Sequence, residues 1–237
     1  MKNFHMMPVE DTKEAQWVIN SIEKPWSRLK NANYVASIIP HGFAAYARLF
    51  HPAYLGTEDM EITWSEVAKH TGRTPHSQMQ WHLITGLKDS KMHVDGLVTP
   101  STGHLPERQV KALIEILYNY TNTPENCYFA IWDGWGYPSV KNLQNQTATF
   151  QLSDRCYYLL KGDIHAAITG ISSFLIPSIW WPQDCTWCVA TEVDMMWTYV
   201  GAAKDCIDDI IRDDRLEAWL ATPDDRADVY GDDINIE

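Results

Sequence analysis

The 237-residue sequence lacks the long hydrophobic runs of membrane-spanning proteins and the leader segment of exported ones. No run approaches the roughly 18 apolar residues that indicate a transmembrane helix. The first sixteen residues contain no apolar core of the kind found in secretory signal peptides. Cysteine is scarce, with five residues at irregular spacing, so a disulfide framework is not indicated. These absences predict a cytoplasmic protein with reduced thiols and no membrane partner.

The sequence also lacks the short motifs that identify a reaction. It contains no Gly-x-Ser-x-Gly elbow, Walker loop, protein-kinase set or His-Glu-x-x-His. Cys185 and Cys188 form a Cys-x-x-Cys without a second pair, which disfavours a zinc knuckle. No metal-ligand spacing occurs among the histidines of the first half, which are His41, His51, His70, His76, His82, His93 and His104. We therefore predict no cofactor and no metal, with a site assembled from distant histidines as a third possibility.

Positive charge is sparse towards the end of the chain. The formal net charge is −12, and the segment from Asp205 to Glu237 carries twelve acidic residues against three arginines. About three quarters of the imbalance therefore lies in the last 33 residues. Nucleic acid is disfavoured as a partner, because phosphate contacts need basic patches. A basic protein partner is compatible with this charge, and so is a solvated acidic surface that aids solubility.

Aromatic residues, by contrast, are abundant, with eleven tryptophans and eleven tyrosines. Four of the tryptophans lie in residues 178–201, which read SIWWPQDCTWCVATEVDMMWTYVG. Pro182, Gln183 and Asp184 interrupt this stretch with turn-forming residues, which predicts a β-hairpin. In the second strand, Glu192 and Asp194 are expected to share one face, because residues two apart in a strand point the same way.

Apolar residues recur with helical spacing in some segments and alternate in others. Helices are predicted at residues 11–22, 64–71, 105–120 and 202–212, the second after a capping box of Thr63 and Glu66, and residues 216–220 are expected to add a turn. Strands are predicted at residues 34–39, 43–50, 127–133, 147–152, 156–161 and 178–201, with Ser153 and Asp154 as turn residues between the fourth and the fifth. Residues 43–50 can instead form a helix, because the alanines among them favour one. This order predicts a single α+β domain at residues 1–223, with a mostly antiparallel sheet of about six strands flanked by helices. Residues 224–237 are expected to form an acidic tail with little to bury.

Two groups of residues are candidate sites. Glu192 and Asp194 can act as an acid and a base if their environments differ, although both can equally face solvent. Five further residues are candidates for an aromatic, acidic groove that stacks on a sugar or holds a cation, and they are Trp132, Asp133, Trp135, Trp180 and Trp181. The same tryptophans can instead form part of the core.

Three segments carry a resemblance to a known family. They are residues 37–54 (SIIPHGFAAYARLFHPAY), 127–136 (CYFAIWDGWG) and 180–201 (WWPQDCTWCVATEVDMMWTYVG). Through them the chain resembles a family of uncharacterised bacterial proteins, common in actinomycetes, for which no activity is known. The resemblance therefore implies no catalytic residue. The expected layout is also loosely similar to that of bacterial toxin-immunity proteins, which is an architectural analogy.

Two functional hypotheses follow. The leading one is a non-enzymatic, immunity- or inhibitor-like protein whose acidic C-terminal region binds a basic partner through Asp205, Asp208, Asp209 and Asp213. The alternative is a hydrolase or carbohydrate-binding protein that uses Glu192 and Asp194 in a tryptophan-lined groove. The alternative predicts a concave pocket that contains at least one carboxylate with a raised pKa.

Overall fold

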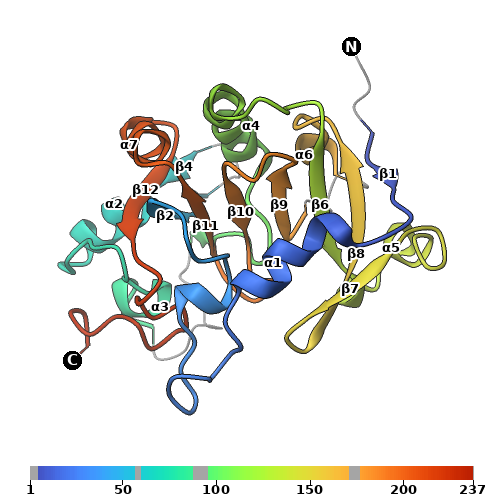
Figure 1. Ribbon diagram of the computed structural model, residues 1–237. Coiled ribbons are helices and arrows are strands. Elements are labelled where there is room, and N and C mark those ends of the chain that lie inside the picture. Colours follow the sequence, from blue (N-terminus) through green and yellow to red (C-terminus); the bar gives the residue numbers. More distant parts are fainter. Residues whose placement is uncertain (1–4, 57–59, 88–95, 171–176, 237) are drawn as a thin grey trace.

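The computed structural model describes residues 5–56, 60–87, 96–170 and 177–236, and it has the predicted α+β architecture (Figure 1). The strands of its large sheet are Met7–Pro8 (β1), Ala45–Phe50 (β2), Cys127–Trp132 (β6), Thr149–Leu152 (β7), Arg155–Gly162 (β8), Ile179–Pro182 (β9), Cys188–Ala190 (β10), Trp197–Ala202 (β11) and Glu217–Ala221 (β12). A smaller sheet contains Ala53–Leu55 (β3), Glu61–Ile62 (β4) and Leu97–Val98 (β5). The helices are Gln16–Ser21 (α1), Trp64–His70 (α2), Trp81–Ile84 (α3), Glu107–Leu117 (α4), Pro138–Lys141 (α5), Ala166–Thr169 (α6) and Lys204–Arg212 (α7). Short 3-10 turns are Lys13–Ala15 (η1), Val35–Ser37 (η2), Tyr118–Tyr120 (η3) and Asp133–Trp135 (η4).

The large sheet is antiparallel at every strand pair in the described residues. Its order is β1-β8-β6-β9-β10-β11-β2-β12, with β7 beside β8 on the same edge as β1. The predicted hairpin is present as β9 and β10, which pair through Val189 and Trp180. Its second strand ends at Ala190, so the expectation that Glu192 and Asp194 share a strand face is wrong, and both follow the strand in a loop. The fold class is confirmed, and the nine strands exceed the expected six because short strands such as β1 and β12 carry little pattern of their own.

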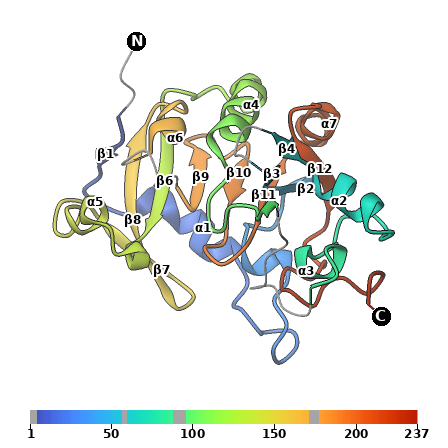
Figure 2. The same cartoon turned by 180° about the vertical axis from the view of Figure 1, so that it is seen from behind.

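Helices cover both faces of this sheet and create two cores. Strand residues alternate between them, so that Ala47 and Leu49 lie in one core while Tyr46 and Phe50 lie in the other. The first core contains the buried faces of α4, α6 and α7, which Figure 1 shows along the upper face of the sheet. The second core contains residues of α1, α2 and α3, and Figure 2 shows α2 and α3 near β2 and β12.

Several local predictions can be compared with these elements. The capping box of Thr63 and Glu66 is confirmed, with both reciprocal hydrogen bonds present at the start of α2. The strand predicted at residues 34–39 is wrong, because this segment forms the 3-10 turn η2. Val35 and Ile39 are both buried and four residues apart, which is the spacing of a helical turn. Residues 216–220 were expected to add a turn, and they instead contribute most of the edge strand β12.

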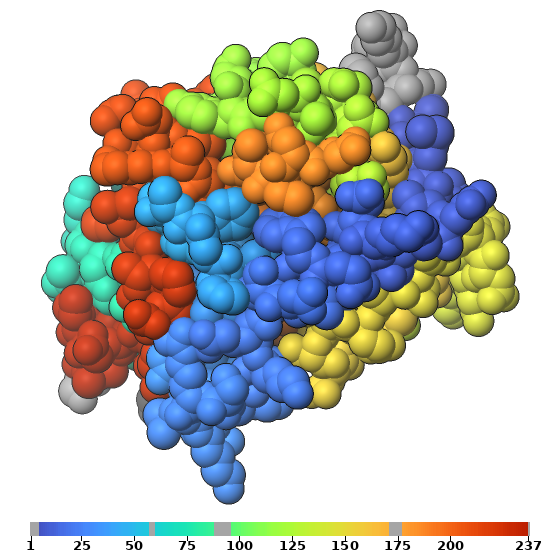
Figure 3. All heavy atoms as spheres, viewed as in Figure 1, coloured from blue at the N-terminus to red at the C-terminus, as the bar shows by residue number. Residues whose placement is uncertain are grey.

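On one side of the molecule, α1 and the following loop run beside the β7–β8 hairpin, as Figure 3 shows where the dark blue and yellow segments meet. Arg28 fixes that loop, since its Nε and Nη2 atoms donate to the two carboxylate oxygens of Glu23 at 2.7 and 2.6 Å. Its Nη1 atom contacts Asp224 at 2.5 Å. The loop thus lies in a defined position next to the sheet.

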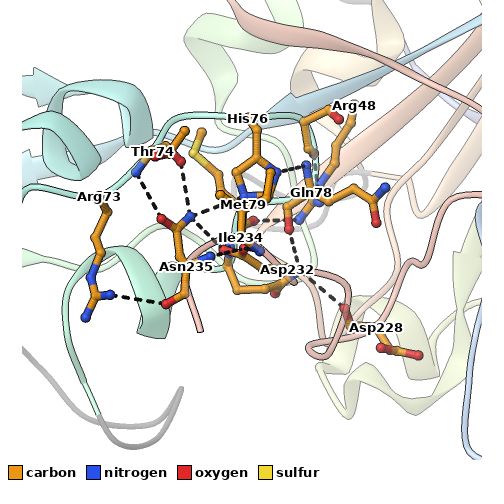
Figure 4. A network of polar contacts seen from close by, with 12 residues as sticks. Arg48, Arg73, Thr74, His76, Gln78, Met79, Asp228, Asp232, Ile234 and Asn235 are labelled. Carbon is orange, nitrogen blue, oxygen red and sulfur yellow. Dashed lines mark hydrogen bonds and ion pairs between the residues drawn. The ribbon is translucent and has the colours of Figure 1, made fainter. Parts of the chain in front are cut away.

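The C-terminal segment packs against the domain, which corrects the expectation of a tail with little to bury. Ala227, Asp232 and Asn235 are buried. Figure 4 shows Asp232 and Asn235 pointing towards Thr74 and His76. Asn235 exchanges two hydrogen bonds with the backbone of Thr74, at 2.9 and 3.1 Å. The composition of the segment is polar, but these specific hydrogen bonds hold it in place.

Candidate functional site

A pocket of about 420 Å³ lies between the loop after α1 and the ends of five strands. Ile179 and Ala190, on β9 and β10, contribute apolar side chains from the second core. Trp132 and Tyr157, at one end of the β6–β8 pairing, add aromatic rings. The pocket therefore has an apolar and aromatic base at one end of the sheet.

Two loops supply the polar side chains of this pocket. The β7–β8 hairpin turns through Ser153 and Asp154, and Ser153 has the positive φ of 56° that tight hairpin turns require. This turn places Arg155 at the first position of β8. Across the pocket, Glu192 and Asp194 lie in the connection from β10 to β11, where the Glu192 carboxylate accepts from the backbone N–H of Asp194 at 2.6 Å.

Arg155 joins the two carboxylates. Its Nη2 atom lies 2.5 Å from Glu192 and 2.9 Å from Asp194. Its guanidinium carbon lies 4.8 Å from the centre of the Trp132 ring, in a cation–π contact. The pocket wall thus combines hydrogen-bond acceptors, a donor and an aromatic ring within one connected cluster.

The two carboxylates occupy different environments. The side chain of Glu192 is 21% exposed and that of Asp194 is 77% exposed. Burial raises the pKa of Glu192 above its ordinary value, and this effect outweighs the opposing influence of the Asp194 backbone N–H and of Arg155. The difference in solvation satisfies the condition under which two neighbouring carboxylates can take different roles.

The structure brings together only part of the predicted groove. Trp132, Glu192 and Asp194 line the pocket, as the alternative hypothesis required. Trp180 and Trp181 are buried on opposite faces of the sheet, so their predicted place in a groove is wrong. Adjacent strand residues point to opposite faces, which is why these two tryptophans separate.

Asp133 and Trp135 also lie elsewhere. Both belong to η4, and neither lines the pocket. The Trp135 ring lies 5.6 Å from the Trp132 ring and packs against the first core. Sequence reasoning missed Arg155 and Trp26, which do line the pocket. The Ser153–Asp154 turn signal indicated a loop beside Arg155, but nothing in the sequence pairs that residue with Glu192.

The acidic residues predicted to bind a partner are found on and just after α7. Lys204 and Arg212 contact Asp208 at 2.5 and 3.8 Å, and Arg212 also approaches Asp209. The Tyr120 hydroxyl donates to Asp209. Arg215 forms an ion pair with Asp213 at 2.6 Å. The side chain of Asp205 is exposed to solvent. A basic partner would have to compete with these internal contacts, and the protein-binding hypothesis stays a prediction.

Other candidate chemistry is limited in the part of the chain that the structure describes. Within it, no group of three or more His, Cys, Asp or Glu side chains is placed to hold a metal ion. His93 lies outside the described residues. All five cysteines are free thiols. No helix in the described ranges is long and apolar enough to cross a membrane.

Comparisons of this chain with protein-family models, curated proteins and solved structures return no match. The geometry of the pocket is therefore the basis on which a function can be proposed.

Proposed function

We propose that the protein binds a carbohydrate in the pocket formed by Trp132, Arg155, Glu192 and Asp194. The observation that carries this proposal is the cluster in which Arg155 links both carboxylates beside the face of Trp132. A sugar presents hydroxyl groups that both donate and accept hydrogen bonds, together with an apolar C–H face. The donor and the two acceptors offer partners for the hydroxyl groups, and the ring of Tyr157, which also lines the pocket, offers one for the C–H face.

The charge of the pocket supports a neutral, polar ligand. Three carboxylates line it, those of Asp154, Glu192 and Asp194, against the single guanidinium of Arg155. This balance disfavours an anionic ligand. A cation is disfavoured at the Trp132 face, where the Arg155 guanidinium already lies. The volume of about 420 Å³ falls within the range of small-molecule pockets, roughly 300–1,000 Å³.

A glycan array with the full chain, followed by titration calorimetry on the sugars that bind, tests the proposal. Asp194→Asn, at a mostly exposed side chain, removes a charged acceptor with little risk to folding. Arg155→Met removes the central donor. We expect each change to weaken sugar binding at least tenfold. Arg215→Met is the matched control, because Arg215 also bridges two carboxylates, those of Glu115 and Asp213, outside the pocket lining.

Absence of binding to every sugar on the array contradicts the proposal. Equal affinities of the wild type and a correctly folded Arg155→Met variant would contradict it as well.

The different solvation of Glu192 and Asp194 favours a second candidate function, the hydrolysis of a glycosidic bond. Glu192, whose pKa is raised by burial, would donate a proton to the leaving oxygen. Once the sugar displaces the Nη2 atom of Arg155 from between the two carboxylates, Asp194 would act as a nucleophile or by activating water, and water would supply the hydroxyl of the product. Glu192→Gln should then abolish hydrolysis of a chromogenic glycoside while sugar binding persists. Binding without turnover by the wild type supports the carbohydrate-binding function alone.

A further inference from the structure

A second hollow of about 480 Å³ adjoins this pocket. The two share Pro25, Trp26, Leu152, Ser153 and Asp154 as lining residues. The second hollow lies between the end of α1 and the β7–β8 hairpin, the two segments that meet in Figure 3. The two hollows therefore form one groove with a common rim.

The second hollow, like the first, is lined by both apolar and polar side chains. Ile19 and Ile22 provide apolar surface, and Glu23, Lys24 and Gln151 provide acceptors and donors. With the shared Asp154, the lining has two carboxylates against the single ammonium of Lys24, and Arg28 already binds both oxygens of Glu23. This hollow, like the first, therefore disfavours an anionic ligand and offers polar partners to a hydroxyl-rich one. A ligand with the same chemistry in successive units matches both hollows.

Trp26 lies on the rim that the hollows share. Its side chain is 55% exposed, although a tryptophan usually buries most of its ring. Its backbone has a φ of 58°, a left-handed conformation that is unfavourable for a bulky residue. Arg28, two residues further on, fixes the loop through Glu23 and Asp224. The chain thus holds a large aromatic ring in solvent, between two polar hollows, at a cost in backbone strain.

We propose that the groove binds a linear oligosaccharide of at least two sugar units, with Trp26 stacking on the unit at the common rim. This inference rests on the proposed carbohydrate-binding function and specifies its ligand class. One unit lies against Trp132, Arg155 and Glu192, and the chain extends over Trp26 towards Gln151. The affinity therefore increases with the length of the oligosaccharide.

The test uses β-1,4-linked oligomers of glucose, of xylose and of N-acetylglucosamine, each from one to six units, in titration calorimetry with the full chain. In the series that binds, we expect the affinity to rise at least tenfold between one and three units. Trp26→Ala should remove this gain, and because Trp26 also lines the first pocket, the affinity for three units should fall at least fivefold more than the affinity for the single unit. Trp26→Tyr, which keeps an aromatic face, should restore most of the gain.

Two further variants separate a binding role from a structural one. Trp26→Gly relieves the left-handed backbone, so it should leave the melting temperature unchanged or raise it while abolishing the length dependence. Tyr230→Ala, at an aromatic side chain that is 73% exposed and lies outside both linings, should alter neither property.

The outcomes distinguish the two proposals. Binding of a series with equal affinity at all lengths, or a full length dependence in Trp26→Ala, overturns the extended groove and leaves the carbohydrate pocket in place. If no oligomer binds and the glycan array is also negative, both proposals fail.

Discussion

At the scale of single residues, His51 shows how the fold controls an ionisable group. The imidazole is fully buried, and its Nδ1 and Nε2 atoms lie 2.7 Å from the Ser101 carbonyl oxygen and 2.9 Å from the Thr198 hydroxyl. Thr198 in turn contacts the Thr191 hydroxyl at 2.7 Å. Burial lowers the pKa of His51 to about 3, so the residue is neutral in the folded protein near pH 7.

This burial predicts a pH dependence of stability. The unfolded chain protonates His51 below its ordinary pKa of about 6.5, whereas the folded protein resists protonation down to about pH 3. The stabilisation is therefore complete above pH 6.5 and is lost as the pH falls, by about 1.4 kcal/mol for each unit. His51→Gln should be less stable at pH 7 but should lose less stability between pH 6.5 and 4.5. Urea unfolding at several pH values measures this, and parallel curves for the two proteins would refute it.

Burial of individual residues was partly predictable from the sequence. The alternation in residues 187–190 correctly assigns Trp187 and Val189 to one core and Cys188 and Ala190 to the other. The same rule separates Trp180 from Trp181, and applying it there would have removed both from the predicted groove. The partners of a buried polar group such as His51 were not predictable, because they come from segments about 50 and 150 residues away.

At the scale of secondary-structure elements, β12 supports the start of α2. The Glu217 carboxylate accepts from the backbone N–H groups of Trp64 and Ser65 at 2.5 and 2.8 Å, and from the Ser65 hydroxyl at 2.6 Å. A carboxylate at this position pairs otherwise unbonded N–H groups and interacts favourably with the helix dipole. The helix therefore has a local cap, Thr63, and a second cap from a distant strand.

Removing this distant cap should destabilise the protein. Glu217→Ala leaves three donors without their acceptor, and we expect a loss of about 1–2 kcal/mol in the free energy of unfolding. Thr63→Ala should cost about 1 kcal/mol through the local cap alone. Glu107→Ala is the control, because its exposed ion pair with Lys111 is worth less than about 0.5 kcal/mol. Denaturant titration compares the variants, and a Glu217→Ala loss no larger than that of the control would count against the distant cap.

One carboxylate, that of Asp232, makes several of the contacts that hold the C-terminal segment. Asp232 accepts hydrogen bonds from the backbone N–H groups of Gln80, Ile234 and Asn235, and it contacts His76 at 2.9 Å. Burial acts to raise the pKa of Asp232, but the hydrogen bonds from Asn235 and the proximity of His76 hold it below its ordinary value. The carboxylate is therefore ionised in the folded protein at neutral pH.

Loss of this carboxylate should release the segment. Asp232→Ala removes several charge-assisted hydrogen bonds, and we expect trypsin to cleave after Arg226 at least tenfold faster than in the wild type. Asp233→Ala changes the adjacent, exposed aspartate and should leave the cleavage rate unaltered. Because the pKa of Asp232 is depressed, its stabilisation is present above about pH 4 and is lost as the pH falls further. Identical cleavage rates in the two variants would show that Asp232 does not hold the segment.

The elements themselves were largely predictable where their pattern is local. The helices α2, α4 and α7 and the hairpin β9–β10 follow from capping residues, helical spacing or turn residues. The strand β12 and the packing of the C-terminal segment depend on Ala47, Thr74 and other residues far along the chain. Such tertiary contacts leave little trace in the local pattern.

At the scale of the whole molecule, the sheet order predicts where the structure is most stable. The strand β2 is bonded on both sides, to β11 and to β12, whereas β12 is an edge strand with Leu220 61% exposed. Amides of β2 and β11 should exchange with solvent more slowly than those of β12, because an edge opens without disrupting its neighbours. Hydrogen exchange measured by mass spectrometry compares the exchange rates of these amides. Equal protection of β2 and β12 would be inconsistent with it.

The pocket shows why a site is harder to predict than a fold. Its lining comes from the loop after α1, η2, the ends of β6, β7, β8, β9 and β10, the β7–β8 turn and the connection to β11. The sequence identified Trp132, Glu192 and Asp194 by residue type, but only the antiparallel pairing of β8 with β6 and of β6 with β9 brings Arg155 near them. Fold class depends on the order of elements, whereas this site depends on where strands end.

The position of β2 also has a consequence for the synthesis of the chain. This strand emerges early, but its two neighbours begin at Trp197 and Glu217, so most of the protein must leave the ribosome before either edge is paired. Until then its sequence, AYARLF, is a β-prone segment able to join another nascent copy. Arg48, at the centre of this segment, is a charge that opposes such pairing, and in the finished fold it lies between Phe50 and Trp197. We therefore expect Arg48 to oppose aggregation of the nascent chain before β11 and β12 are available to pair with β2.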